Sequence, residues 1–199
     1  MDYVDFSYFK YINTSTITQV TLDSNANNHT VVNIENVYGT DFVDNIIGDG
    51  SSNSLVGNGG TDIILGGIGD DFIYGGDNTD NDSTSTVYEI LDGGAGADYI
   101  EGGAGNDSII GGTENDIVYG NSGNDILDGG AGEDTLRGNS GDDTFFGGAD
   151  NDQLIGGSGS DTADYTGVAS KIIANVSTNA SGADIGIDIF SGIENITGG

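Results

Sequence analysis

A nine-residue repeat runs without interruption through about two-thirds of the chain. Fourteen nonamers follow one another from Gly39 to Asp164; the first position is Gly in thirteen of them, and the sixth is Asp in twelve. The eighth position is apolar in all but one. Richness in Gly and Asp alone would not keep this phase over 126 residues, so the repeat predicts a regular architecture of stacked units.

Each nonamer is expected to form a tight turn followed by a short strand. The second position is Gly, Asn or Asp in all but two nonamers, and these residues tolerate a left-handed backbone. The first six residues are therefore predicted to turn, and the last three to form a strand whose eighth-position side chain points inward. Because each turn reverses the chain, two nonamers make one coil of 18 residues, and equivalent residues of stacked coils lie about 4.8 Å apart.

Stacking would align the sixth-position side chains in two columns, one along each edge. One column is predicted to contain Asp44, Asp62, Asp80, Asp98, Asp116, Asp134 and Asp152; the other is predicted to contain Asn53, Asp71, Glu89, Asp107, Asp125, Asp143 and Asp161. Like charges at this spacing repel strongly where water is scarce. Divalent cations between the carboxylates would remove this repulsion.

Calcium is the cation that fits this pattern. It accepts six or more oxygen ligands, backbone carbonyls included, in flexible geometry, whereas magnesium requires a stricter octahedron. Zinc prefers His and Cys ligands, but the chain contains one His and no Cys. We therefore predict that the chain binds several Ca²⁺ ions.

The repeat resembles the calcium-binding nonapeptide G-G-x-G-x-D-x-U-x of the hemolysin-type RTX (repeats-in-toxin) family, in which U is apolar. GGAGADYIE at 93–101 and GGAGNDSII at 102–110 follow it closely. The resemblance covers residues 39–164. It implies an all-β fold, a right-handed parallel β-roll (β-solenoid) of about seven 18-residue coils with β-rich capping flanks.

The resemblance also implies which atoms bind calcium. Carbonyls at the second and fourth positions of one turn would join those at the first and third positions of the turn one coil later, together with both carboxylates. One well-formed site would contain Gly103, Gly105 and Asp107 with Gly120, Ser122 and Asp125. The carboxylate ligands implied are Asp44, Asp62, Asp71, Asp80, Asp98, Asp107, Asp116, Asp125, Asp134, Asp143, Asp152 and Asp161. The carbonyl ligands implied are those of Gly94, Gly96, Gly103, Gly105, Gly111, Thr113, Gly120, Ser122, Gly123, Gly130, Gly132, Gly138, Ser140, Gly141, Gly147, Ala149, Gly156 and Ser158.

Two nonamers depart from the pattern. Phe42 and Val87 occupy the fourth position, where a bulky side chain fits positive φ badly. Residues 77–89 combine several departures and are predicted to form a bulged loop. If 18 residues are looped out, Asp62 comes into phase with Asp98.

The flanking segments repeat each other. DYVDFS at 2–7 matches DTADYT at 161–166, and IENVYG at 34–39 matches IENITG at 193–198, both with an offset of 159 residues. We expect residues 1–38 and 165–199 to be β-rich caps of the roll at 39–164. The offset predicts that the chain is one unit of a tandem array, with neighbouring modules of the parent chain as partners.

The net charge and the lack of recognisable catalytic motifs argue against several classes of function. A formal net charge of −30 makes nucleic acid an unfavourable partner, and no apolar run approaches the length of a membrane span. No catalytic motif is recognisable, so we expect no enzyme activity; the one histidine, His29, is expected in a solvated loop.

The family resemblance implies a calcium-binding structural module of a large bacterial RTX protein. Such a module would leave the cell by type I secretion and fold extracellularly or at the cell surface when calcium binds. The parent could be an adhesin, a toxin, a surface-layer protein or an enzyme. An alternative is a calcium-dependent module that binds a polysaccharide or a cell surface for an extracellular enzyme or adhesin.

Overall fold

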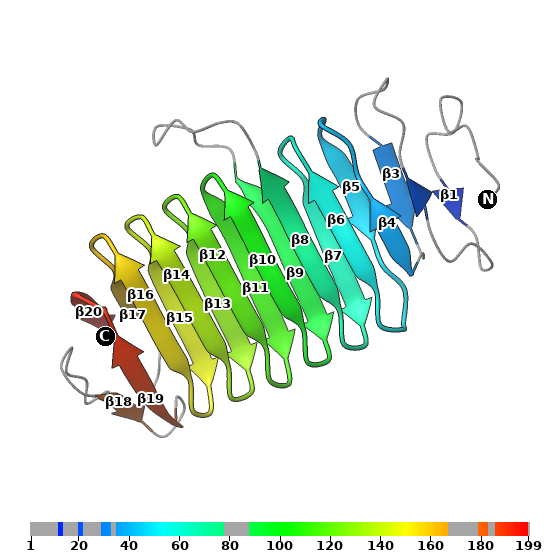
Figure 1. Ribbon diagram of the computed structural model, residues 1–199. Helices are drawn as coiled ribbons and strands as arrows, with labels where there is room; N and C mark the ends of the chain where they lie inside the picture. The colour runs from blue at the N-terminus through cyan, green and yellow to red at the C-terminus, as the bar shows by residue number, and fades with distance from the viewer. Residues whose placement is uncertain are drawn as a thin grey trace.

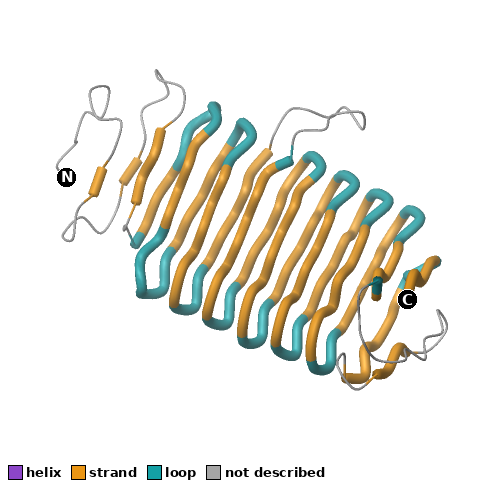
Figure 2. Tube along the Cα trace, turned by 180° about the vertical axis from the view of Figure 1, so that it is seen from behind, coloured by secondary structure: helices purple, strands orange, loops and turns teal. Residues whose placement is uncertain are grey.

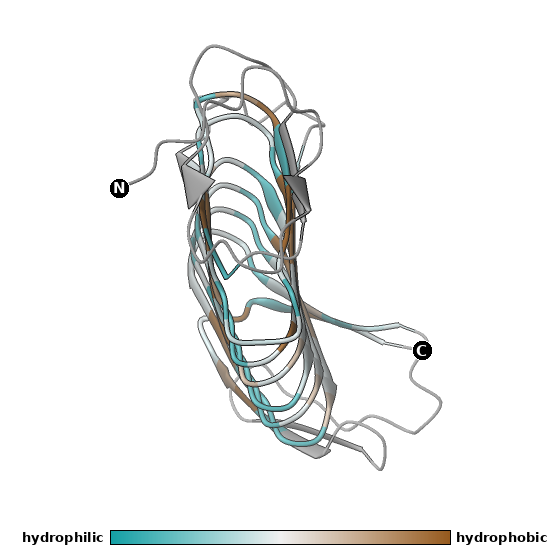
Figure 3. Ribbon diagram, turned by 90° about the vertical axis from the view of Figure 1, so that its right-hand side faces the viewer, coloured by the Kyte–Doolittle hydropathy of each residue, from teal (hydrophilic) through white to brown (hydrophobic). Residues whose placement is uncertain are grey.

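The nonamers fold into an all-β parallel β-solenoid of about six turns, whose two sheets face each other (Figures 1 and 3). The computed structural model describes residues 12–13, 20–21, 29–32, 35–77, 88–166, 179–182 and 186–198. Within these ranges no helix is present, and hence none that could cross a membrane. Turns at both edges pass the chain from one sheet to the other (Figure 2).

Both sheets have ten strands, and consecutive strands of the roll alternate between them. The first sheet has, in spatial order, β1 (Ile12–Asn13), β3 (His29–Val32), β5 (Asp44–Ile47), β7 (Ile63–Ile68), β9 (Glu89–Ala95), β11 (Asp107–Thr113), β13 (Ile126–Ala131), β15 (Thr144–Ala149), β17 (Thr162–Tyr165) and β20 (Asn195–Gly198). The second has β18 (Asn179–Gly182), β19 (Gly186–Ser191), β16 (Gln153–Ser158), β14 (Thr135–Ser140), β12 (Ile117–Ser122), β10 (Tyr99–Ala104), β8 (Phe72–Asp77), β6 (Ser54–Asn58), β4 (Asn36–Tyr38) and β2 (Val20–Thr21). Only the β18–β19 pair, among the described strands, is antiparallel.

The eighth-position side chains fill the space between the sheets, as predicted. The solvent exposure of each is 0 % for Ile46, Leu55, Ile64, Ile73, Leu91, Ile100, Ile109, Val118, Leu127, Leu136, Phe145, Leu154 and Ala163. Because each nonamer supplies only this one side chain, the apolar core is a single file along each sheet.

The strands are longer than the sequence predicts. β10 contains the last three residues of one nonamer and the first three of the next, ending at Ala104. The prediction of a six-residue turn is therefore wrong. Second-position residues such as Gly103 (φ 116°) and Asn121 (φ 78°) do have positive φ. They remain in the ladder because both have positive φ and lie opposite each other in stacked coils.

One interval changes the register of the roll. Ile64 pairs with Leu91, and Ile73 with Ile100, at a separation of 27 residues instead of 18. Nine residues, or one nonamer, are thus looped out between β8 and β9, and the prediction of 18 is wrong. Residues 78–87 lie outside the described part of the chain. Glu89, which was expected in the loop, begins β9.

The flanks add strands to both ends of the two sheets. His29 begins β3, so its expected place in a solvated loop is wrong. The domain boundaries at 38/39 and 164/165 stay predictions. "The roll" below means residues 39–164.

Candidate metal centre

Two columns of acidic side chains run along the edges of the roll, but their membership differs from the prediction. Because one nonamer is looped out, the partners exchange sides after β8. The first column contains Asp44, Asp62, Glu89, Asp107, Asp125, Asp143 and Asp161; the second contains Asn53, Asp71, Asp98, Asp116, Asp134, Asp152 and Asp188. The solvent exposure of every member is at most 5 %.

One oxygen of most interior Asp carboxylates accepts a backbone hydrogen bond; Asp107 is the exception, since neither of its oxygens has a partner within the described residues. The N–H of Asp107 donates to Asp125 Oδ1 at 2.9 Å, and the N–H of Asp125 donates to Asp143 Oδ1 at 2.9 Å. In the other column, the N–H of Asp98 donates to Asp116 Oδ1 at 2.8 Å. These bonds hold each accepting carboxylate at the turn of its own coil and orient its second oxygen.

The second oxygen is buried and, within the described part of the chain, accepts no hydrogen bond. This applies to Oδ2 of Asp62, Asp71, Asp98, Asp107, Asp116, Asp125, Asp134, Asp143, Asp152 and Asp161. Each lies beside the first-position glycine of its own turn. A Cβ placed on Gly111 would lie 2.5 Å from Asp116 Oδ2 and 2.7 Å from the carbonyl oxygen of Gly129, one coil later. The glycine thus keeps open a small cradle that contains a carboxylate oxygen and a carbonyl oxygen.

Burial makes these carboxylates hard to ionise without a counterion. Desolvation is the main cause that raises the pKa of Asp107 to about 7 and that of Asp125 to about 8. Repulsion from Asp107 and Asp143 adds to the shift of Asp125. In the second column, desolvation raises the pKa of Asp116 to about 7 and that of Asp152 to about 8.

The oxygen atoms at these edges fit a hard cation. Nowhere in the described ranges do three His, Cys, Asp or Glu side chains come together. A cation there would consequently be held by carboxylates of adjacent coils and completed by backbone carbonyls. Calcium accepts such mixed oxygen ligands at variable angles, and the unpartnered Oδ2 atoms and glycine cradles provide them.

The register brings together the residues predicted for one well-formed site. Gly103 lies near the end of β10, Gly105 follows that strand and Asp107 begins β11; one coil later, Gly120 and Ser122 lie at the end of β12 and Asp125 precedes β13. The N–H of Gly105 donates to the Ser122 carbonyl at 2.8 Å. These six residues share one edge of the roll, and their binding of calcium stays a prediction.

The family model of the RTX calcium-binding nonapeptide repeat matches residues 38–73, 56–81, 89–118, 101–136 and 128–163. This chain belongs to the RTX calcium-binding nonapeptide repeat family. Between the first and the last RTX match, only residues 82–88 are not covered, and they fall where the register skips one nonamer. A search of the curated proteins found no match. RTX β-rolls are typically structural and are typically found in proteins that bacteria secrete, and this repeat in a β-solenoid indicates a calcium-binding structural module.

Not every predicted ligand occupies a regular RTX turn. Asp80 lies outside the described residues. In the first RTX turn, Thr40 donates to Asp44 Oδ2 from its N–H at 2.7 Å and from its hydroxyl at 3.0 Å. Thr40 thus occupies the oxygen that is unpartnered in the ten Asp residues named above, in agreement with the predicted irregularity at Phe42.

Three acidic residues at the RTX columns were not among the predicted ligands: Glu89 and Asp188 are buried members, and the exposed Glu194 lies at the end of the first column. Glu89 lies in the place expected for Asp80, beside Gly75. Asp188 Oδ1 accepts the Asp152 N–H at 3.1 Å, and Glu194 Oε2 accepts the Asp161 N–H at 2.9 Å. Asp188, 36 residues after Asp152, is formally in phase with the nonamers but lies beyond the last recognisable one; Glu194, 33 residues after Asp161, is out of phase, so the repeat did not indicate either residue.

Proposed function

We propose that this RTX module is a structural part of a large secreted bacterial protein and folds when it binds calcium outside the cell. The observation that supports this most strongly is the pair of buried columns with their ten unpartnered Asp Oδ2 atoms. A buried carboxylate without a partner is costly, because it loses hydration and gains nothing in return. Calcium binding offsets that cost in the folded chain only.

The thin core is consistent with this dependence. Each nonamer buries one apolar side chain, while its turn must be ordered at an entropic cost of roughly 1–2 kcal/mol for each residue. Ions that bind the folded state and not the unfolded one add their binding free energy to the stability of the fold. We infer that several calcium ions supply what the core lacks.

The place of folding follows from where calcium is abundant. Calcium sites of extracellular modules typically have a Kd of about 10⁻⁴ to 10⁻³ M, which the low calcium concentration of a cytosol leaves empty. An RTX chain would stay unfolded inside the cell, pass through a type I secretion system, and fold outside. The chain contains no cysteine, so this folding would need no disulfide.

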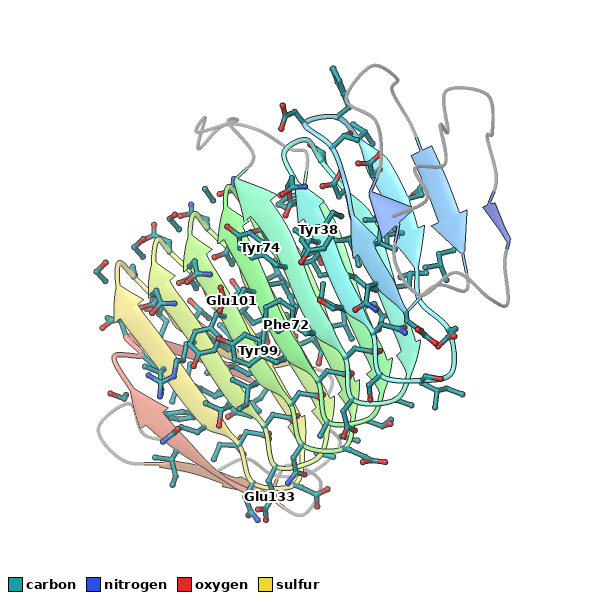
Figure 4. All side chains as sticks on the ribbon, turned by 45° about the vertical axis from the view of Figure 1, so that its right-hand side comes forward. Tyr38, Phe72, Tyr74, Tyr99, Glu101 and Glu133 are labelled. Carbon is teal, nitrogen blue, oxygen red and sulfur yellow. The ribbon has the colours of Figure 1, made fainter. Side chains whose placement is uncertain are left out.

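The alternative of a polysaccharide-binding module has one candidate surface in the described part of the chain. Phe72, Tyr99 and Glu101 lie on the outside of the second sheet, over β8 and β10 (Figure 4). The rings of Phe72 and Tyr99 stack on each other, with centroids 5.4 Å apart and planes 5° apart. Because the ring faces cover each other, they are not presented flat for a sugar to stack on, and we do not favour this alternative.

Calorimetric titration tests the proposal. Calcium added to the EDTA-treated chain should bind at several sites with a large heat of folding, and magnesium at the same concentration should not. Asp125→Asn removes one charge from a column and should raise the calcium concentration at half-saturation. Asp142→Asn is the matched control, because the Asp142 side chain is exposed and accepts the Ser160 N–H with an oxygen that Asn retains. Equal effects of the two substitutions would contradict the proposed sites.

A further inference from the structure

The chain contains the same linking sequence on both sides of the roll. IENVYG at 34–39 includes β4, and IENITG at 193–198 includes β20. Equivalent residues are 159 positions apart, so Val37 corresponds to Ile196 and Gly39 to Gly198. One chain thus shows this segment in two settings, first with a coil that follows it and then with a coil that precedes it.

The first copy shows how the segment contacts a following coil. β4 pairs in parallel with β6. The N–H of Ser54 donates to the Glu35 carbonyl at 2.7 Å, and the N–H of Gly39 donates to the Val56 carbonyl at 2.6 Å. Glu35 and Gly39, and Val37 midway between them, therefore direct their backbone groups toward the next coil.

The second copy shows the opposite side of the segment. β20 pairs in parallel with β17, and the N–H of Asn195 donates to the Asp161 carbonyl at 2.9 Å. Successive residues of a strand direct their backbone groups to opposite sides, so those of Ile196 and Gly198 point away from β17. These two residues correspond to Val37 and Gly39. The edge that binds the next coil in the first copy is thus the outer edge of β20, the last strand of the first sheet (Figure 1).

We propose that the outer edge of β20 is a docking surface for a second roll of this sequence, and that two rolls joined there form one continuous stack. The strand of the second roll that corresponds to β6 pairs with β20. The Gly198 N–H and the Glu194 carbonyl then make the bonds that Gly39 and Glu35 make in the first copy. The proposal rests on the calcium-dependent folding of each roll proposed above.

The second sheet must rearrange for this joint to form. β18 covers the outer edge of β19, with Asn179 opposite Ile189. At the N-terminal end, β3 lies 159 positions before part of β19, and it pairs with β5 of the roll. Likewise, β2 lies 159 positions before part of β18, but β2 pairs with β4 and does not cover the edge of β3. A docked second roll therefore displaces β18 from β19.

A chain with two rolls tests the joint. In it, residues 1–198 are followed directly by residues 40–199, because Gly198 takes the place of Gly39, and amide hydrogen exchange is measured by NMR in saturating calcium. The Ile196 N–H, which faces outward in the single chain, gains a carbonyl acceptor from the second roll. Its exchange should slow by at least about 100-fold relative to the single chain.

A register control accompanies the fusion. One glycine inserted between the rolls shifts the pairing by one residue and turns inward-facing side chains outward, so Ile196 should exchange as it does in the single chain. Unchanged exchange of Ile196 in the direct fusion would overturn the proposal, and so would equal protection in the glycine-inserted chain. A failure of calcium-dependent folding is distinguishable, because Leu127 in the roll would then lack protection as well.

Discussion

Asp107 and Asp125 lie one coil apart at the same edge of the roll, and the backbone N–H of Asp107 donates to Asp125 Oδ1 at 2.9 Å. Oδ2 of Asp125 and both carboxylate oxygens of Asp107 are buried, with no hydrogen-bond partner in the described structure. In Asp125, one oxygen thus fixes the stacking of the coils while the other remains available to a cation. The same residue type therefore serves both the fold and the proposed calcium site.

Interior carboxylates should matter more for calcium binding than the terminal one. Asp116→Asn should raise the calcium concentration at the folding midpoint by about 10-fold, equivalent to about 1.4 kcal/mol, because Asp116 Oδ2 has no other partner in the described structure. Asp188→Asn should have a smaller effect, because the Tyr165 hydroxyl already donates to Asp188 Oδ2 at 2.5 Å. Calcium titrations followed by circular dichroism compare the two variants. Identical midpoints would contradict this account of the second column.

The first-position glycines are expected to be necessary for the space they leave. Gly111→Ala would place a methyl group 2.5 Å from Asp116 Oδ2 and 2.7 Å from the Gly129 carbonyl. We expect it to lower the free energy of unfolding in saturating calcium by about 1–3 kcal/mol. Gly50→Ala is the control, because a Cβ there meets no atom within 4 Å. Denaturant titrations that give equal losses for both would show that the cradle does not need glycine.

The single-file core should make individual eighth-position residues important. Leu127→Ala removes a side chain that is fully buried and should lower the free energy of unfolding by about 2–5 kcal/mol. Its neighbour Ile126 lies on the outside of the same strand with an exposure of 38 %, so Ile126→Ala should change stability by about 0.5 kcal/mol or less. Denaturant titrations in saturating calcium measure both. A similar cost for the two substitutions would argue against the inward orientation of Leu127.

Acid should partly replace calcium in promoting the fold. Burial raises the pKa of Asp107 to about 7 and those of Asp125 and Asp152 to about 8, from the ordinary value of 3.8. Because the folded pKa exceeds the unfolded one, the metal-free fold is favoured below about pH 4 and loses stability as the pH rises toward 8. In EDTA, the β-sheet signal in circular dichroism should therefore increase from pH 8 to pH 5.

The same protons should compete with calcium. The calcium concentration at half-saturation of the folded chain should rise as the pH falls from 8 to 5, because each ion must displace the protons that the buried carboxylates have taken up. A half-saturation concentration that does not depend on pH over this range would contradict the assignment of these groups as ligands.

The repeating part of the fold could be predicted from the sequence because nearly all nonamers share one pattern, with Gly first, Asp sixth and an apolar residue eighth. Ile100 and Leu127 occupy the same position of their nonamers, and both are fully buried as predicted. The strand length could not be read from the pattern, because residues such as Gly103 were assigned to a turn from their backbone tolerance alone. Stacking on a residue of the next coil that also has positive φ keeps them in the ladder.

The columns were harder to predict than the core. The nonamer frame continues formally through residues 78–87, so it could not show that one repeat is looped out and that Glu89 follows Asp62. Asp188 joins the second column from the C-terminal flank, beyond the last recognisable nonamer, and Glu194 meets the end of the first column at a separation that is not a multiple of nine. Their places depend on long-range pairing, which a local pattern does not determine.

The central claim is that calcium and folding are coupled, and circular dichroism with amide hydrogen exchange at pH 7.5 tests it most directly. In excess EDTA the chain should lack a β-sheet spectrum, and Leu127 and Leu136 should exchange as in an unfolded chain. Added calcium, but not magnesium, should restore the spectrum, protect both amides and produce a cooperative thermal transition. A complete β-sheet spectrum with cooperative melting in EDTA would contradict the claim, and so would folding driven equally well by magnesium.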